Sequence, residues 1–571
     1  MVRVLLDSAG RCGGILNSMN AEIKGAGDAT VEEAEREIDA AFAANALKNE
    51  GYAQAAWTLL SQSEDAYIKA LHTLPYGEVD IFTDIRMNSL SYPLRVCHRE
   101  CPPSSKLRDV MISAHYQLAW DWLTLADHGY YNFSSIFPLW HRGKVKCAVE
   151  GNRLHTEVPK DEKSYEAYNR LIQKDAKPER TAILPHDTIA QAVLAKTSFG
   201  KDWYRVNFDP RLVAQLVSGL VPFAAVRHSL PEEWTFGGFT LGQYRKVFVT
   251  VQAMLWGWMV ARNLLVEKLY GIGYRSAVWV VSRDELSTRL RRYTSLEAET
   301  VERILALMTF GASGIRNPDI AIQPLLDLRN GFLALSPFVW LNTNAERNLC
   351  VLLNQIPEQR KIYDRLKNEK ETLLKAEMKE FVSALGLDVR SGVVDGTDLD
   401  LAIIDRKNSD CLCLELKWFI EPAEIREIGE RTTELKGGVE QARKIRALYE
   451  RGDRRLARDV LDIEPGYRFM AAVASQNWIG HSEAQDPDVP IVKVWHLLHA
   501  IRDRGSLRSA MEWLKNRDYM PKEGTDFAII PIEIACGKWT GAWYGIKPLV
   551  DGLPLDRLQR LPEVDPIRQQ R

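Results

Sequence analysis

The sequence predicts an α+β protein of several domains, in which a mostly helical N-terminal region precedes a smaller mixed α/β core. Two observations support this prediction. Apolar residues recur at helical spacing over much of residues 1–360, whereas residues 397–417 read as two short strands joined by a polar turn. Helical patterns flank these strands, so we expect a mixed central sheet covered by helices. At 571 residues the chain has room for roughly two to four domains.

Composition places the chain among ordinary globular proteins and excludes strongly basic ones. Apolar residues make up 46% and charged residues 26%. The net charge is −2, so any binding of nucleic acid must rely on local patches. Eight cysteines without regular spacing, and an N-terminus without an apolar signal core, predict a cytoplasmic protein with reduced thiols. The longest apolar stretch, 247–261, is shorter than the roughly 20 residues of a membrane span, so we expect a buried helix and no membrane partner.

The predicted domains are a mostly helical recognition or regulatory region (1–360), an α/β core (361–515) and a C-terminal extension (516–571). Within the first, the polar run 159–180 is expected to be a surface segment or a boundary between two subdomains. A hairpin is predicted at 144–158, and two strands at 320–341. Helical patterns lie at residues 31–48, 50–72, 104–128, 187–198, 210–220 and 241–270.

The most informative segment is 397–417, TDLDLAIIDRKNSDCLCLELK. Its first strand carries Asp400, and its second ends in Glu415 and Lys417, which share one face because side chains alternate along a strand. Carboxylate oxygens suit Mg²⁺, and an ammonium beside them can steer a water molecule or steady a phosphate. Glu-x-Lys also occurs three times elsewhere, but only this copy ends an apolar strand that follows a strand bearing an acid.

Amphipathic helices are predicted on both sides of this segment. In the helix at 365–385, Glu377 falls within the apolar arc, and in the helix at 435–450, Gln441 does the same. A carboxylate on a buried face is costly unless a partner or a metal takes it, although a residue at the rim would reach solvent. Two strands, 468–475 and 489–495, and a helix at 496–503 follow. The predicted order is helix, three strands, helix and two strands.

This order resembles the core of the PD-(D/E)xK phosphodiesterase superfamily, which has the restriction-endonuclease-like fold. The resemblance covers about residues 361–505. It implies that Asp400 and Glu415 bind Mg²⁺, with Mn²⁺ able to substitute, and that Lys417 orients the attacking water. Glu377 would match the acid of the family's first helix, and Gln441 the auxiliary polar residue of its second helix.

Two features depart from a simple match or stay open. No proline precedes the aspartate, and Asp398 shares the face of Asp400, so either could be the metal ligand; Asp400 is preferred because it stands just ahead of the apolar run. A run of cations after Gln441 could track a phosphate backbone, although a solvated helix surface explains it equally well. The run comprises Arg443, Lys444, Arg446, Arg451, Arg454, Arg455 and Arg458.

The resemblance implies a metal-dependent nuclease that hydrolyses phosphodiester bonds, in DNA more readily than in RNA. Restriction, defence or repair would follow by analogy alone. The alternative is a catalytically inactive nucleic-acid-binding or scaffold protein that has kept the fold. The sequence has no Gly-x-x-x-x-Gly-Lys-Ser/Thr loop for ATP. A homodimer or a partner protein stays open, because nothing in the sequence marks a dimer surface.

Overall fold

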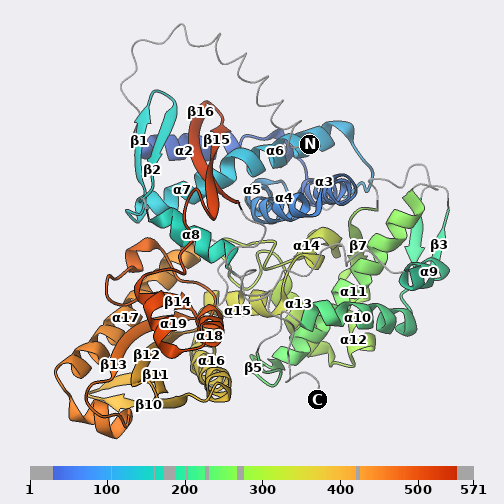
Figure 1. Cartoon of the computed structure of the whole chain (residues 1–571). Helices are drawn as coiled ribbons and strands as arrows, with labels where there is room; N and C mark the ends of the chain where they lie inside the picture. Colours follow the sequence, from blue (N-terminus) through green and yellow to red (C-terminus); the bar gives the residue numbers. More distant parts are fainter. Residues whose placement is uncertain are drawn as a thin grey trace.

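The computed structural model describes residues 30–103, 106–159, 161–172, 187–200, 203–225, 230–266, 276–419 and 425–549. It is a mixed α/β protein with several small sheets. A five-stranded sheet with its helices (yellow to orange) forms one end of the molecule, and the N-terminal helices (blue) and the central helices (green) form the rest (Figure 1).

The N-terminal part is a helical bundle with its own core. Its first helix begins at a capping box, in which the Thr30 hydroxyl accepts from the Glu33 backbone N–H and the Glu33 carboxylate accepts from the Thr30 N–H. Helix α3 (Tyr52–Thr73) is buried on most of its circumference and centres on Trp57. The helices are α2 (Val31–Phe42), α3 (Tyr52–Thr73), α4 (Tyr76–Ser89), α5 (Ser91–Glu100), α6 (Ser113–Leu125) and α7 (Tyr131–His141).

The central part packs around one long buried helix, α11 (Leu241–Val266), which contains the apolar stretch 247–261. Within the described residues, no helix is long and apolar enough to cross a membrane. The other helices are α9 (Asp187–Ala195), α10 (Pro210–Ala225), α12 (Arg283–Thr294), α13 (Ala298–Met308), α14 (Pro337–Leu341) and α15 (Ala345–Gln355). The strands are β3 (Thr197–Phe199), β4 (Tyr204–Val206), β5 (Thr235–Phe236), β6 (Phe239–Thr240), β7 (Trp279–Ser282), β8 (Leu325–Asp327) and β9 (Phe332–Leu335).

A four-stranded sheet joins the two ends of the chain. The hairpin β1 (Lys146–Glu150) and β2 (Arg153–Glu157), predicted from the sequence, lies beside β16 (Trp539–Pro548), which pairs with β15 (Phe527–Cys536) (Figure 1). The segment expected as a C-terminal extension is therefore, over its described strands, part of the N-terminal structure. Local patterning cannot reveal this pairing, because nearly 400 residues separate the partners, for instance Leu154 and Gly541.

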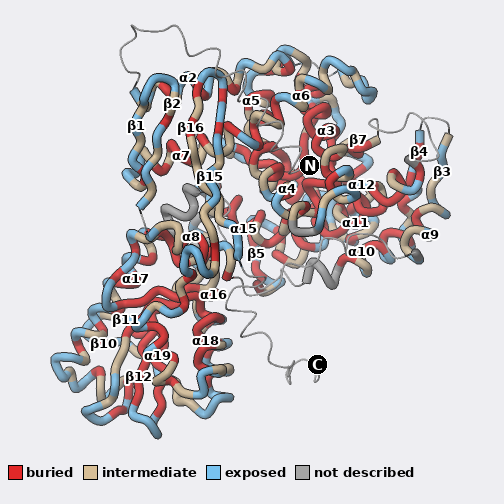
Figure 2. Tube along the Cα trace, turned by 45° about the horizontal axis from the view of Figure 1, so that its top comes forward, coloured by how far each residue is buried: buried red, intermediate tan, exposed pale blue. Residues whose placement is uncertain are grey.

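The five-stranded sheet has the order β10-β11-β12-β13-β14. Its first three strands are antiparallel, and β12, β13 and β14 run parallel, so the sheet is mixed as predicted. The buried residues (red in Figure 2) run through its strands and the helix sides that face them. The strands are β10 (Asp388–Val394), β11 (Thr397–Asp405), β12 (Asp410–Lys417), β13 (Arg468–Ser475) and β14 (Ile491–Lys493). The helices are α16 (Pro357–Ala384), α17 (Ile425–Glu450), α18 (Val494–Asp503) and α19 (Leu507–Lys515).

The expectation that 159–180 forms a surface segment is wrong for α8 (Glu162–Leu171), which packs into the core of the five-stranded sheet. Tyr168 is fully buried, and its hydroxyl lies 3.0 Å from Nδ1 of His496 on α18. The amide of Asn169 donates to the carbonyl of Gly480. Residues 173–186 of the same run lie outside the described residues. An element more than 200 residues earlier in the sequence than the rest of this core thus completes it.

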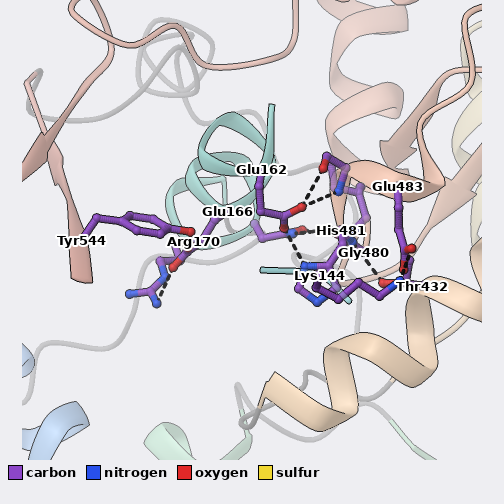
Figure 3. Close-up of polar contacts among 12 residues, drawn as sticks. Lys144, Glu162, Glu166, Arg170, Thr432, Gly480, His481, Glu483 and Tyr544 are labelled. Carbon is purple, nitrogen blue, oxygen red and sulfur yellow. Dashed lines mark hydrogen bonds and ion pairs between the residues drawn. The ribbon is translucent and has the colours of Figure 1, made fainter. Parts of the chain in front are cut away.

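Another part of the α8 surface contacts the four-stranded sheet (Figure 3). There the Tyr544 hydroxyl donates to Glu166 at 2.5 Å, while Glu162, one turn earlier on the same helix, pairs with His481 at 2.6 Å. Lys144, which follows α7, also forms an ion pair with Glu483. The five-stranded sheet is thereby attached to the N-terminal part through polar contacts of one short helix and of Lys144.

Candidate functional site

The β11–β12 hairpin places two acids side by side. Leu401 pairs with Leu414, and one further step of the same antiparallel register sets Asp400 opposite Glu415. Residues directly opposite each other in an antiparallel pair project to the same face. Both carboxyl side chains are buried, whereas Asp398 is exposed. Of the two aspartates left open by the sequence, the structure therefore brings Asp400 to Glu415.

Each acid has a lysine partner. Oδ1 of Asp400 lies 2.6 Å from Nζ of Lys375 on α16, and its Oδ2 accepts from the Leu416 backbone N–H at 2.8 Å. Oε1 of Glu415 lies 2.7 Å from Nζ of Lys417. The backbone bond ties the Asp400 side chain to the end of β12. Asp400, Glu415 and Lys417 thus converge at one edge of the sheet, as the sequence predicts.

The two acids are only partly compensated. Burial, and then the charge of Asp400, raise the pKa of Glu415 to about 7, although Lys417 opposes the shift. The charge of Glu371 on α16 adds to the increase. A carboxyl group that holds its proton near neutral pH beside a second carboxylate has a strong electrostatic reason to take up a cation.

The acid that α16 directs toward the site is Glu371. The prediction that Glu377 lies on the buried face of this helix is wrong. Glu377 is exposed, whereas Glu371 is half-buried and contributes to the potential at Glu415. The apolar arc drawn from the sequence included Leu373, which is 40% exposed. This inclusion turned the arc away from the buried stripe of α16, which consists of Leu366, Lys370, Leu374, Met378 and Val382. Glu371 and Lys375 lie beside that stripe, one helical turn apart.

Helix α17 crosses the site at a glycine. A Cβ atom on Gly438 would lie 3.1 Å from Cε of Lys417 and 3.4 Å from Cγ of Glu415, so the helix approaches both functional side chains closely. Gln441 is half-buried and follows Gly438 by three residues, so it lies on the same side of the helix one turn on. The structure thus places Gln441 near the site edge. The Gly437–Gly438 pair was visible in the sequence, but nothing there showed what it touches.

A buried hydroxyl also borders Lys417. Ser475 of β13 is its neighbour in the parallel register, and parallel partners share a face. The Oγ atom of Ser475 is buried and finds no hydrogen-bond partner among the described residues. Trp418 is the residue that follows β12. The Nζ atom of Lys370 lies over its ring, 4.1 Å from the ring centroid. The strand end that carries Lys417 is therefore held in place from α16.

The cation run after Gln441 is largely compensated. Arg443 pairs with Asp486, Arg446 with Asp488 at 3.1 Å, and Arg451 with Asp395 at 3.1 Å. Arg455 lies 3.8 Å from Asp395 as well. Arg451, the residue after the end of α17, lies about 20 Å along the helix direction from Gly438. These pairs weaken the hypothesis that the run tracks a phosphate backbone.

The residues fit a hard divalent cation. Mg²⁺ typically takes one or two carboxylates from the protein and completes its shell with water and substrate phosphate. Asp400 and Glu415 supply such a pair; burial is the main cause of the raised pKa of Glu415, and the charge of Asp400, which a cation would offset, is the second. No cluster of three or more His, Cys, Asp or Glu suited to a metal occurs in the described part of the chain.

Comparisons with known proteins give no match to this chain, whether with protein-family models, with curated proteins or with solved structures.

Proposed function

We propose that the protein is a Mg²⁺-dependent nuclease of the PD-(D/E)xK type that cleaves DNA more readily than RNA. The observation that carries the proposal is the convergence of Asp400, Glu415 and Lys417 at one edge of a mixed sheet. The order α16, β10 to β12, α17, β13 and β14 agrees with the restriction-endonuclease-like core that the sequence resembles. The raised pKa of Glu415 beside Asp400, at about 7, adds support, because perturbed acids cluster at functional sites.

In this proposal Asp400 and Glu415 would hold a divalent cation, which would supply charge neutralisation at the scissile phosphate and a more acidic water. Lys417, bonded to Glu415 at 2.7 Å, positions that water or helps to deprotonate it. Gln441 orients the phosphate or Lys417 from α17. Glu371 increases the negative potential at Glu415 and so favours cation uptake. Mn²⁺ would serve in place of Mg²⁺, since it accepts the same oxygen donors.

The large helical region would recognise, regulate or recruit. Its attachment through α8 makes the five-stranded sheet part of a larger body rather than a free domain. Restriction, antiviral defence or repair in the cytoplasm are the settings that this analogy suggests. A homodimer or a partner protein would be detected by measuring the mass of the purified protein in solution.

The experiment is a cleavage assay with purified protein on supercoiled plasmid, linear duplex, single-stranded DNA and RNA. Each substrate is incubated with Mg²⁺, with Mn²⁺ and with EDTA. We expect cleavage of a DNA substrate with either ion, none in EDTA, and none by Lys417→Ala. If no substrate is cut under any condition, or if Lys417→Ala cuts like wild type, the proposal fails and a non-catalytic binding protein becomes the better account.

A further inference from the structure

Lys375 is a functional-site residue that neither the sequence pattern nor the family resemblance includes. Its ammonium lies 2.6 Å from Oδ1 of Asp400. The other oxygen, Oδ2, is fixed by the Leu416 backbone N–H, which cannot leave without disturbing the end of β12. Of the two partners of Asp400, only the lysine is therefore free to move.

The environment of Lys375 allows that movement. Its side chain is 31% exposed, against 12% for the Asp400 side chain that it contacts. A lysine carries a compact, well-hydrated charge on a flexible four-carbon stem, so it exchanges an ion pair for water at small cost. Lys417 is more enclosed, at 18% exposure, and is attached to Glu415 rather than to Asp400. The two lysines of the site thus occupy different carboxylates and differ in mobility.

We infer that Lys375 is a resident counter-ion of Asp400 that a divalent cation must displace, and that the displaced ammonium then contacts a phosphate of the bound nucleic acid. This inference rests on the proposed function. An ammonium within a few ångströms of the cation would repel it, whereas the same ammonium turned outward would attract a phosphate. Lys375 therefore makes cation binding weak in the free protein and couples tight binding of the cation to the arrival of substrate.

The test measures Mn²⁺ binding without nucleic acid, by electron paramagnetic resonance of the free ion, on the full chain. We compare wild type with Lys375→Met and with Lys379→Met. Lys379 is one turn further along α16 and exposed, so it matches the change in charge without touching Asp400. We expect Lys375→Met to bind Mn²⁺ about tenfold more tightly than wild type, and Lys379→Met to bind like wild type.

A second measurement tests the phosphate contact. Fluorescence anisotropy follows a labelled DNA with Ca²⁺ present and with EDTA, since Ca²⁺ also binds carboxylate oxygens. We expect Lys375→Met to weaken DNA binding several-fold in Ca²⁺. In EDTA we expect no change, because the lysine of the wild type then stays paired with Asp400 and does not contact the DNA. Lys375→Gln should behave like Lys375→Met if the charge is the cause, which separates the effect from lost packing.

The outcomes separate this inference from the proposed function. If wild type cuts DNA but Lys375→Met binds Mn²⁺ no more tightly than wild type, Lys375 is not a competitor and the inference fails while the nuclease stands. If wild type neither binds Mn²⁺ nor cuts any substrate, the proposed function fails and takes the inference with it. If Lys375→Met and Lys379→Met gain Mn²⁺ affinity by the same factor, the cause is the general loss of a positive charge. This result would also overturn the inference.

Discussion

The β11–β12 hairpin carries an acid pair at each end, and the two pairs are compensated in different ways. At the turn, Asp410 is completely buried and lies 3.3 Å from the Nε atoms of both Arg468 and Arg508. Its neighbour across the strands, Asp405, accepts from the backbone and side-chain amides of Asn408 in the turn. At the other end, Asp400 and Glu415 have one lysine each.

The two ends also differ in the kind of cation that faces the acids. Asp410 faces two arginines, which are always charged, although its buried carboxylate oxygens form no hydrogen bond within the described residues. At the other end each acid faces one lysine, and burial, followed by the charge of Asp400, raises the pKa of Glu415 to about 7. Two acids on adjacent strands are therefore weak evidence of a metal site. Acids whose charge is only partly neutralised, by cations that can move away, are stronger evidence of such a site.

The largest expected effect is on cleavage. Glu415→Gln should lower the cleavage rate about 10²–10⁴-fold, because it removes one of the two charged oxygen ligands and the partner of Lys417. Asp410→Asn, the matched change at the turn end, should leave the rate within about twofold of wild type at temperatures where it is folded. Initial rates on one substrate measure both variants. Comparable losses of cleavage rate in Glu415→Gln and Asp410→Asn would remove the distinction between the two ends of the hairpin.

The same Glu415→Gln change should raise stability, and only at higher pH. The folded protein holds the Glu415 proton up to a pKa of about 7, whereas the unfolded chain releases it near 4.5. Because the folded state binds the proton more tightly, wild-type stability falls as pH rises through that window. Glutamine removes the loss, so urea unfolding should show a gain of about 1–3 kcal/mol at pH 8 and almost none at pH 4.

For Asp410→Asn we expect the opposite sign, since it removes the carboxylate that faces two arginines. Its stability should be lower than that of wild type, because the two arginines would then face a neutral amide in place of the acid. If Glu415→Gln is destabilising at pH 8, the Glu415 carboxylate is fully compensated and the contrast between the two ends is wrong.

An intermediate effect is expected where α17 crosses the site. Gly438→Ala would press on Lys417 and Glu415 and should lower the cleavage rate about tenfold to a hundredfold, because small displacements of reacting groups are costly. Gly437→Ala, with no neighbouring atom within 4 Å of the added Cβ, is the control. Both changes favour helix formation equally. A rate loss in Gly437→Ala of the same size would point to the helix itself rather than to the contact.

The smallest effect concerns the acids of α16. Glu371→Gln should reduce cleavage a few-fold at limiting Mg²⁺, since it removes negative potential at Glu415, and excess Mg²⁺ should restore the rate. Glu377→Gln should have no effect, because the side chain is exposed and away from the site. Mg²⁺ titrations of the cleavage rate measure both. A larger loss of cleavage for Glu377→Gln than for Glu371→Gln would show that Glu377 is the acid of α16 that acts on the site.

The sequence was sufficient where the signal is local. Alternation over residues 397–417 predicts β11 and β12, and the apolar run 468–475 predicts β13 to the residue. The strand predicted at 489–495 is confirmed only as β14 (Ile491–Lys493), because α18 already begins at Val494. Asp400, Glu415 and Lys417 converge because a strand register translates directly into a shared face.

The remainder depends on packing that no local pattern contains. The buried stripe of α16 is set by its neighbours, so an exposed Leu373 misdirected the choice toward Glu377 and away from Glu371 and Lys375. The burial of α8 in a core whose other residues lie more than 200 residues further along the chain is likewise non-local. The contact of Gly438 with Lys417 requires the crossing of α17 over the sheet, which the sequence does not specify.

The most direct test of the account exchanges one oxygen for nitrogen at each end of the same strand, β11. Asp400→Asn and Asp405→Asn are compared with wild type for cleavage of one DNA substrate in Mg²⁺, with folding checked by circular dichroism. The account predicts that Asp400→Asn loses cleavage while Asp405→Asn retains it. Cleavage at the wild-type rate by a folded Asp400→Asn protein would contradict it.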